Sequence, residues 1–384
     1  MVTECSKLSI GIDASNIGVA GGATHLVEIL RHLDPSNHNI GRVLVWGGQG
    51  LLDRIESREW LELLNPSQLE RSLLHRLYWQ QFRLAKEAAD CDVLFVPGGL
   101  YLGRFRPFVT MMRNMLPFDL EERARYGISV DRLRLHLLEW GQRKTFQRAA
   151  GTIFLTRTSQ NTFVEQHGKL PGHIAIIPHG VNKKFAHDPE TRDFHHPVSK
   201  NGKPFRWLYV SPVRLYKHQW NVVRAVEMLE KMGYSIELDL VGHANSSALT
   251  KLRSVRQQVD PGGEYIRYHG RVPHRRVDNF YRRADGFVFA STCETFGQVL
   301  TEAMQTGLPI ACSNRSTAPE VVQDAGEYFD PERPDQIAAA MQKIMEKEDL
   351  RKERAQLARE RADEYSWSRC ARETFSFILD VCKS

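Results

Sequence analysis

The chain has 384 residues, which is more than one hydrophobic core usually holds, so its length predicts two domains. It is 42% hydrophobic and 26% charged, as an ordinary soluble globular protein is. Its formal net charge of +6 predicts an anionic partner without deciding between a nucleotide, a nucleic acid and an acidic membrane surface. No run of apolar residues approaches the roughly 18 that a membrane-spanning helix needs.

The N-terminal segment and the cysteines both predict a cytoplasmic protein. The segment MVTECSKLSIGIDAS has no apolar core of a secretory signal. The six cysteines are scattered and form no C-x-x-C pair, which fits a reducing compartment. The histidines of HDPETRDFHH, residues 187–196, lack metal-ligand spacing, so we expect a solvated loop there.

In the first half, short apolar runs alternate with helical patterns. Leu26, Ile29, Leu30 and Leu33 recur at the spacing of one helix face. The predicted strands are residues 8–13, 42–47, 92–97, 108–112 and 151–156. A polar segment rich in Pro, His and Asp follows at 183–205, and we expect it to be an interdomain linker.

The second half repeats this alternation, with a helix predicted at 221–232 and a helical, charged end after residue 330. Its predicted strands are residues 207–211, 236–242, 265–270, 286–291 and 308–313. Strands that alternate with helices predict parallel sheets covered by helices on both faces. Ligands of such sheets bind beyond the carboxyl ends of the strands, so functional residues are expected in strand-to-helix turns, around a cleft between the two domains.

Two of these turns carry groups that suit an anion. Gly18, Gly21 and Gly22 precede the helix of Leu26, and the start of that helix either binds a phosphate or simply follows a tight turn. Arg214 and Lys217 follow strand 207–211. Two cations at a strand end can clamp a diphosphate, although solvated surface cations are the alternative.

A third turn, CETFGQVLTEA, has Glu294 at the junction and Glu302 eight positions later. The backbone N–H groups of Phe296 and Gly297 could face an anion or a sugar hydroxyl, because a helix begins there. Glu294 is otherwise a favourable charge at a helix start. Helical spacing puts Glu302 opposite the apolar residues, which predicts a solvated face.

Two further strand ends carry polar side chains. Arg113 and Asn114 follow strand 108–112 in MMRNMLPFD. His179 lies in IIPHGVN at the end of the first half, where it is either a cleft residue or a buried structural histidine.

The segment ETFGQVLTE, Glu294 to Glu302, resembles the E-x7-E motif of retaining glycosyltransferases with the GT-B fold. GGATHLVEIL, IIPHGVN, SPVRLYKH and YSWSRCARETFSFIL are similar, in this order, to other landmarks of glycosyltransferase family four. The resemblance implies two doubly wound Rossmann-like α/β domains that face each other across a cleft. Residues 1–184 would form the acceptor side and 205–367 would bind the nucleotide sugar, with helix 368–384 packing back on the first domain.

The resemblance also implies roles for single residues. Glu294 would contact hydroxyls of the donor sugar and Glu302 the ribose. The backbone at Phe296 and Gly297 would hold the sugar and phosphate. The diphosphate would be neutralised by Arg214 and Lys217 and faced by Gly21 and Gly22, without a metal ion or another cofactor.

The chain departs from the family pattern at two places. The cations Arg214 and Lys217 are spaced R-x2-K, whereas many relatives have R-x4-K, so the loop is shorter here. Asn114 stands near the position where many relatives have a histidine, which puts a side-chain base there in doubt. Together with Arg113 and His179, it remains a candidate for the acceptor side or the cleft.

The resemblance implies sugar transfer to a saccharide or lipid-linked acceptor in bacterial surface-polysaccharide (O-antigen) assembly. GDP-mannose is the expected donor and a UDP-sugar the next. Other enzymes on this fold, such as a nucleotide-sugar epimerase or a sugar-phosphate synthase, are alternatives. A basic nucleic-acid-binding protein is a third, although the basic residues form no stripe with aromatic ones.

The segment 71–88 has Leu74, Leu77, Tyr78 and Phe82 on one helical face, interrupted by basic residues. It predicts either a helix that contacts the anionic inner face of the membrane or a core-facing helix with a charged back.

Overall fold

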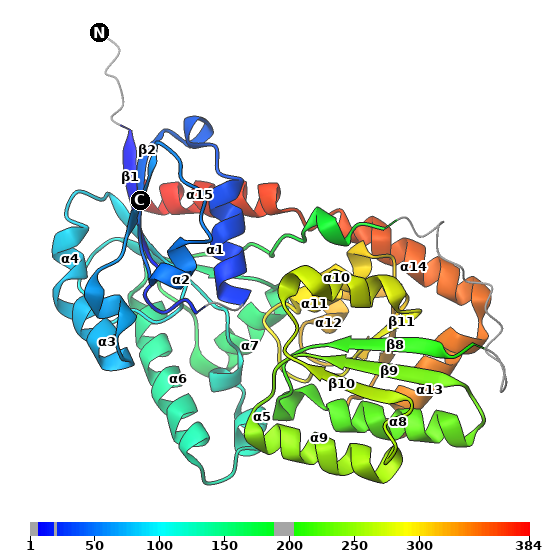
Figure 1. Ribbon diagram of the computed structural model, residues 1–384. Helices are drawn as coiled ribbons and strands as arrows, with labels where there is room; N and C mark the ends of the chain where they lie inside the picture. Colours follow the sequence, from blue (N-terminus) through cyan, green and yellow to red (C-terminus); the bar gives the residue numbers. More distant parts are fainter. Residues whose placement is uncertain (1–6, 19–20, 188–202) are drawn as a thin grey trace. The chain divides into compact units, whose positions relative to one another are not determined.

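The computed structural model in Figure 1 describes residues 7–18, 21–187 and 203–384. These residues divide into two compact units. Unit 1 contains Met1–Phe118, Ile128–Gly180 and Trp367–Ser384, and unit 2 contains Asp119–Gly127 and Val181–Ser366. Most of the predicted linker, and all but the first residue of the histidine-rich stretch, lie outside the described residues.

Unit 1 is built on a seven-stranded parallel sheet in the order β3-β2-β1-β4-β5-β6-β7. Its strands are β1 Leu8–Asp13, β2 Ile40–Trp46, β3 Leu61–Leu64, β4 Val93–Val96, β5 Phe108–Met111, β6 Gly151–Phe154 and β7 His173–Ile176. Its helices are α1 Gly21–Arg31, α2 Gln49–Leu52, α3 Leu73–Phe82, α4 Leu84–Glu87, α6 Val130–Arg148, α7 Arg157–His167 and α15 Trp367–Lys383, with short 3-10 turns η1 Pro35–His38, η2 Ser67–Glu70 and η3 Leu116–Phe118. The central strands β4 and β5 are buried along their whole length, as expected for a parallel sheet covered on both faces.

The C-terminal helix α15 is part of unit 1, where it packs on α1, β4 and β6. The first residue of β6 shows how close this packing is. A Cβ atom at Gly151 would meet the side chain of Val381 at 2.8 Å and that of Phe377 at 3.0 Å. Glycine at this position therefore lets the helix approach the strand.

Unit 2 is built on a six-stranded parallel sheet in the order β10-β9-β8-β11-β12-β13. Its strands are β8 Phe205–Val210, β9 Ile236–Val241, β10 Ile266–Gly270, β11 Gly286–Phe289, β12 Ile310–Ser313 and β13 Gly326–Phe329. Its helices are α5 Leu120–Ala124, α8 Gln219–Lys231, α9 Ser246–Val259, α10 His274–Arg283, α11 Gln298–Gln305, α12 Ala318–Val322, α13 Pro334–Glu346 and α14 Glu348–Ala362, with short turns η4 Lys183–Phe185, η6 Leu215–Lys217 and η7 Gln323–Ala325. Helices α8 and α9 lie on one face of this sheet, and α10, α11 and α14 lie on the other (Figure 1).

The domain limits differ from those predicted at two places. Asp119–Gly127 belongs to unit 2, where Arg125 pairs with Glu332 at 2.9 Å. Unit 2 also begins earlier than residue 205, since the Val181 N–H donates to the carbonyl of Tyr365 at 3.0 Å. Contacts of this kind do not affect the periodicity of the sequence, so the sequence could not predict these domain limits.

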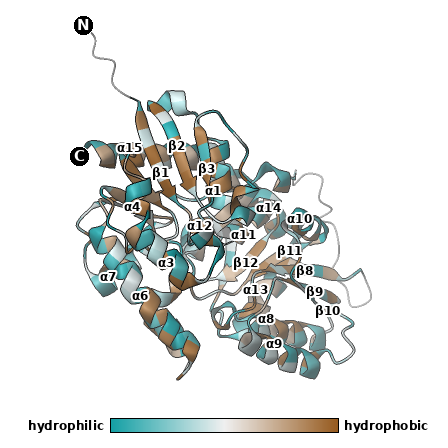
Figure 2. Cartoon of the chain, turned by 60° about the vertical axis from the view of Figure 1, so that its left-hand side comes forward, coloured by the Kyte–Doolittle hydropathy of each residue, from teal (hydrophilic) through white to brown (hydrophobic). Residues whose placement is uncertain are grey.

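The hydropathy of the chain follows the layers of each unit. In Figure 2 the strands are mostly brown, whereas many helices are brown on one side and teal on the other. Within the described part of the chain, none of the helices combines the length and the apolar character needed to cross a membrane.

Candidate functional site

The candidate site of unit 2 lies where the strand order of its sheet reverses. Strands β8 and β11 are neighbours, while β9 and β10 continue to one side and β12 and β13 to the other. The connections from β8 and β11 therefore leave the sheet in opposite directions, and a crevice opens beyond their carboxyl ends. Lys217 follows β8 and Glu294 follows β11, so both side chains reach this place.

Lys217 is a buried cation with a carboxylate partner. Its side chain is only 7% exposed, and its Nζ pairs with Oε1 of Glu294. The ammonium also lies 4.8 Å from the ring centre of Phe289, the last residue of β11, at a cation–π distance. A buried charge is costly unless it is paired, so this ion pair holds both side chains in place.

Two serines that the sequence analysis missed fix the orientation of Glu294. Ser291 donates from its hydroxyl to Glu294 Oε1 at 2.7 Å. The backbone N–H of Glu294 donates to the hydroxyl of Ser316 at 2.8 Å. Ser316 has a φ of +59°, a conformation that non-glycine residues seldom adopt. The signal for Ser316 was its position three residues after the end of the predicted strand 308–313.

Arg214 is the second cation of this turn, and it differs from Lys217 in its surroundings. It is half-buried, and no carboxylate of the described residues lies within ion-pair distance of it. Its charge contributes, after burial, to lowering the pKa of His243. The turn after β8 thus carries one cation that is neutralised internally and one that is available to an anion.

Gly297 forms the sharp turn before α11. Its φ of +86° and ψ of +56° lie in the left-handed region, where glycine is strongly favoured. A Cβ atom there would also meet Leu300 at 3.0 Å. Phe296 beside it is buried, with its ring 5.4 Å from that of Tyr365. The turn leaves the first backbone N–H groups of α11 without partners inside the helix.

The solvated face predicted for Glu302 is wrong. Glu302 is 5% exposed, and its Oε2 accepts a hydrogen bond from the Tyr281 hydroxyl at 2.9 Å. Gln305 on the same face is buried too. The reason is that α14, α12 and η4 all pack around α11, so every residue of this short helix from Leu300 to Gln305 is buried. Burial raises the pKa of Tyr281, and the nearby Glu302 carboxylate raises it further.

His218 joins the turns that follow β8 and β11. It has a φ of +48°, and its Nε2 lies 3.3 Å from the hydroxyl of Thr292. The Thr292 N–H in turn donates to the carbonyl of Tyr216 at 2.9 Å. Burial, together with the charge of Arg125, lowers the pKa of His218 to about 4, so this histidine is neutral at physiological pH.

In unit 1, the start of α1 lies beside a guanidinium group. Nη1 of Arg113 is 3.5 Å from the carbonyl oxygen of Gly22, and a Cβ atom at Gly22 would come within 3.0 Å of Nη1. Burial lowers the pKa of Arg113 to about 10, which still leaves it charged at neutral pH. Gly21 is the first residue of α1, and residues 19–20 lie outside the described part.

Asn114, next to Arg113, is exposed. Its side-chain oxygen accepts a hydrogen bond from the N–H of Leu116 at 3.2 Å, which closes the turn into η3. This local bond gives the residue a structural role in unit 1.

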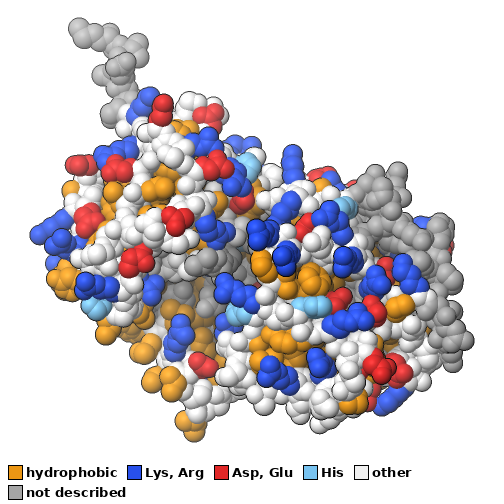
Figure 3. Space-filling model, in the orientation of Figure 1, with side chains coloured by type: hydrophobic (Ala, Val, Ile, Leu, Met, Phe, Trp, Pro, Cys, Tyr) orange, Lys and Arg blue, Asp and Glu red, His pale blue; other side chains and the backbone are white. Residues whose placement is uncertain are grey.

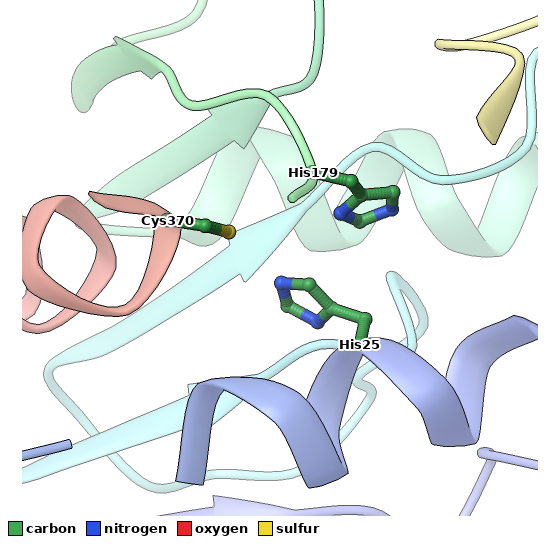
Figure 4. A group of neighbouring side chains, drawn as sticks. All are labelled: His25, His179 and Cys370. Atoms are coloured by element: carbon green, nitrogen blue, oxygen red, sulfur yellow. The ribbon is translucent and has the colours of Figure 1, made fainter. Parts of the chain in front are cut away.

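His179 belongs to a buried group in unit 1 with His25 and Cys370, shown in Figure 4. The imidazole nitrogens and the thiol point toward a common space, and the ligand-capable atoms lie within 4.8 Å of one another. The rings of His25 and His179 are 4.6 Å apart, and each packs near Trp367. This is the structural role that the sequence left open for His179.

The charges around this group disfavour a divalent cation. Burial, with a contribution from the charge of Arg113, lowers the pKa of both histidines well below the usual range. Burial raises the pKa of the Cys370 thiol to about 12, so all three side chains are neutral. A divalent ion with one thiolate would leave a net positive charge in a buried space that already feels a guanidinium. We therefore assign the group to the core of unit 1.

Two family models match the chain in succession. The model described as Glycosyltransferase Family 4 matches residues 19–185, and the one described as Glycosyl transferases group 1 matches residues 190–361. The chain belongs to the family-four glycosyltransferases. The family predicted from the sequence motifs is thus confirmed.

Individual relatives agree with this family. Over 112 residues the glycosyltransferase is 36% identical to the O-antigen chain mannosyltransferase B of Escherichia coli, a match that covers 29% of each chain and so under two thirds of the relative. A glycosyltransferase structure from Rickettsia africae superposes with a TM-score of 0.70 at 15% identity and covers 98% of this chain and 99% of its own.

A second solved structure, the Anabaena protein HepE in complex with UDP-glucose, has a TM-score of 0.68 at 16% identity and covers 97% of this chain and 99% of its own. At such low identities the two structures establish the fold, and the predicted GT-B fold with its Rossmann-like domains is confirmed.

Proposed function

We propose that this glycosyltransferase moves a sugar from a nucleotide-sugar donor to a saccharide or lipid-linked acceptor, with retention of anomeric configuration. The observation that carries the proposal is the buried ion pair of Lys217 and Glu294 at the carboxyl ends of β8 and β11. A parallel sheet offers this position to its ligand, and the family membership makes a nucleotide sugar the expected one.

Cleavage of the bond from the anomeric carbon to the diphosphate builds negative charge on the departing oxygens and positive charge on the sugar. Arg214, which no described carboxylate pairs, supplies a positive charge to the diphosphate. Lys217 and the N–H groups at the start of α11 add to it. Groups that stabilise charge developing in the transition state lower the barrier selectively.

The two glutamates would hold the two ends of the donor. Glu294 is oriented by Lys217 and Ser291, and its carboxylate can accept hydrogen bonds from sugar hydroxyls. Glu302 and Tyr281 form a buried polar pair beside α11, and we assign the ribose of the nucleotide to this pair. These roles follow the family resemblance and are supported by the fixed orientation of both carboxylates.

The cations and helix starts would make a metal ion unnecessary, because they supply the positive charge that a divalent ion supplies in other enzymes. Retention would then proceed by attack from the face that the leaving group leaves, with a diphosphate oxygen accepting the acceptor proton.

A mannosyl donor is favoured because of the similarity to an O-antigen mannosyltransferase, and GDP-mannose is the first candidate. A UDP-sugar is the second, since a protein of the same fold holds UDP-glucose. The acceptor would be a growing surface polysaccharide on the cytoplasmic side of the membrane.

The test is a transfer assay in EDTA with GDP-mannose or UDP-glucose and p-nitrophenyl hexosides as soluble acceptors. Mass spectrometry should find an acceptor that has gained one hexose. The one-bond coupling between the anomeric carbon and its proton, measured by NMR, should show that the product keeps the α configuration of the donor. A β-linked product would contradict retention. Release of free sugar at the same rate with and without acceptor, or isomerisation of the donor, would contradict transfer and favour a hydrolase or an epimerase.

A further inference from the structure

Helix α3 turns an apolar face to the solvent. Its core side carries Trp79 and Gln80, which are buried. Leu74, Tyr78 and Phe82, spaced four residues apart, lie on another face, and Leu74 is 76% exposed. The rings of Tyr78 and Phe82 lie 5.0 Å apart, so they form one surface. The structure therefore contradicts the alternative in which this apolar face meets the core.

Helix α6 carries a second outward apolar stripe, which the sequence analysis did not detect. Leu133, Leu137 and Trp140 recur at intervals of four and three residues and are all at least half exposed. The buried side chains of this helix, such as Leu135 and Phe146, occupy the opposite side. A helix that is apolar on both sides needs a second partner besides its own core.

The two helices are neighbours in unit 1. Gln80 of α3 donates from Nε2 to the carbonyl of Leu100 at 3.1 Å. A Cβ atom at Gly141 of α6 would lie 2.7 Å from the Leu100 side chain. Both helices thus pack against one loop, and Figures 1 and 2 show them side by side. We call the residues Leu74, Tyr78, Phe82, Leu133, Leu137 and Trp140 the α3–α6 surface.

The two segments that carry this surface are basic. The segments 71–88 and 130–148 contain nine Lys and Arg residues against three Asp and Glu, a net charge of +6. Lys144 lies over the ring of Trp140 at 4.0 Å, and Figure 3 shows basic and hydrophobic side chains mixed over α3 and α6.

We propose that the α3–α6 surface docks on an anionic lipid bilayer, with its apolar side chains in the headgroup region and the basic residues on the lipid phosphates. Long basic side chains around exposed aromatic and aliphatic residues suit this boundary. A second copy of the chain is disfavoured, because a symmetric dimer through this surface would bring two segments of like charge together. The inference rests on the proposed function in one respect, since a lipid-linked acceptor lies in such a membrane.

The test is flotation of the full chain with vesicles of phosphatidylcholine that contain 30% phosphatidylglycerol, against vesicles of phosphatidylcholine alone. Binding to the anionic vesicles should be at least tenfold stronger and should fall in high salt. The variant Leu133→Glu/Leu137→Glu should weaken binding at least tenfold. Met232→Glu, which changes a half-exposed apolar residue of unit 2, should leave it unchanged.

Equal binding of the double variant and the wild type would overturn the proposal. The proposal would also be overturned if the wild-type chain did not bind vesicles but formed a dimer, while the double variant was a monomer. The surface would then join two copies of the chain. Transfer to a soluble p-nitrophenyl hexoside should be the same in both proteins. If the double variant no longer floats with the vesicles but still transfers sugar to the soluble acceptor, the membrane surface and the proposed transfer reaction are shown to be separate, so each proposal can fail without the other.

Discussion

The buried polar groups of the two units differ in their partners. In unit 2, the side chains of Lys217 and Glu294 form an ion pair with each other. In unit 1, His25, His179 and Cys370 are all buried, and their shifted pKa values make all three neutral. Burial of a polar residue at a strand end therefore does not identify a site by itself. A buried ion pair at a strand end is the stronger sign of function, since apolar residues would cost less at the same place.

The largest expected effect follows the change Lys217→Met. It should lower kcat on the order of 10²- to 10³-fold, because the leaving group loses a preorganised positive charge and Glu294 loses its partner. The matched control is Lys231→Met, which breaks the exposed pair of Lys231 with Glu227 in the same unit and should leave kcat unchanged. Steady-state kinetics with GDP-mannose and UDP-glucose would measure both. A Lys217→Met enzyme within threefold of the wild type would contradict the role of the pair.

A smaller effect is expected for Glu302→Gln. The amide can still accept the hydrogen bond of Tyr281, so the fold should survive, while the hydrogen bonds of the carboxylate to the ribose weaken. We expect nucleotide affinity to fall about tenfold, or roughly 1.4 kcal/mol, as measured by titration calorimetry. Unchanged affinity together with an altered melting temperature would instead make Glu302 a purely structural residue.

The third prediction concerns pH and His218. Burial holds its pKa at about 4 in the folded chain, below the ordinary value of 6.5. Between these values the unfolded chain binds more protons, so the stabilisation is complete above pH 6.5 and is lost as the pH falls toward 4. The full contribution is of the order of 3 kcal/mol.

His218→Asn removes the titrating ring while keeping a residue that tolerates the left-handed backbone. Its free energy of unfolding, measured in urea at several pH values, should therefore fall less steeply than that of the wild type from pH 6.5 to 4. Parallel pH profiles would contradict the shifted pKa.

The smallest effect is expected for His25→Phe. Among the described residues, neither ring nitrogen of His25 has a hydrogen-bond partner, and the ring packs against His179. An apolar ring of similar shape should leave stability unchanged or raise it by about 1 kcal/mol, with transfer activity intact. Thermal unfolding with and without EDTA would check this. A strong loss of stability that EDTA reproduces in the wild type would show that the group binds a metal ion after all.

The sequence predicted the interior of both sheets better than their edges. The ten predicted strands all occur. The structure adds β3, β7 and β13, each of which is an edge strand of its sheet. Edge strands such as His173–Ile176 are short and partly exposed, so they lack the apolar run that marks a central strand.

For the candidate site, the sequence predicted where its residues lie along the chain better than it predicted which of them are buried. The positions of Lys217, Glu294 and Gly297 at strand ends followed from the alternation of strands and helices. The burial of Glu302 did not, because it depends on α14, which is distant in sequence. The outward stripe of α6 was missed because helical periodicity does not tell which of two apolar faces meets the core.

The most direct test of the site in unit 2 is a thermal-shift screen of the full chain with GDP, UDP, dTDP and ADP in EDTA. A ligand that binds only the folded state at about 100 times its Kd stabilises it by roughly 2.7 kcal/mol. One nucleotide should raise the midpoint of the wild type and do so less in Glu302→Gln, since this variant changes a group assigned to the ribose. If no nucleotide shifts the wild type, or if the variant responds as strongly, the assignment of this site to a nucleotide-sugar donor is contradicted.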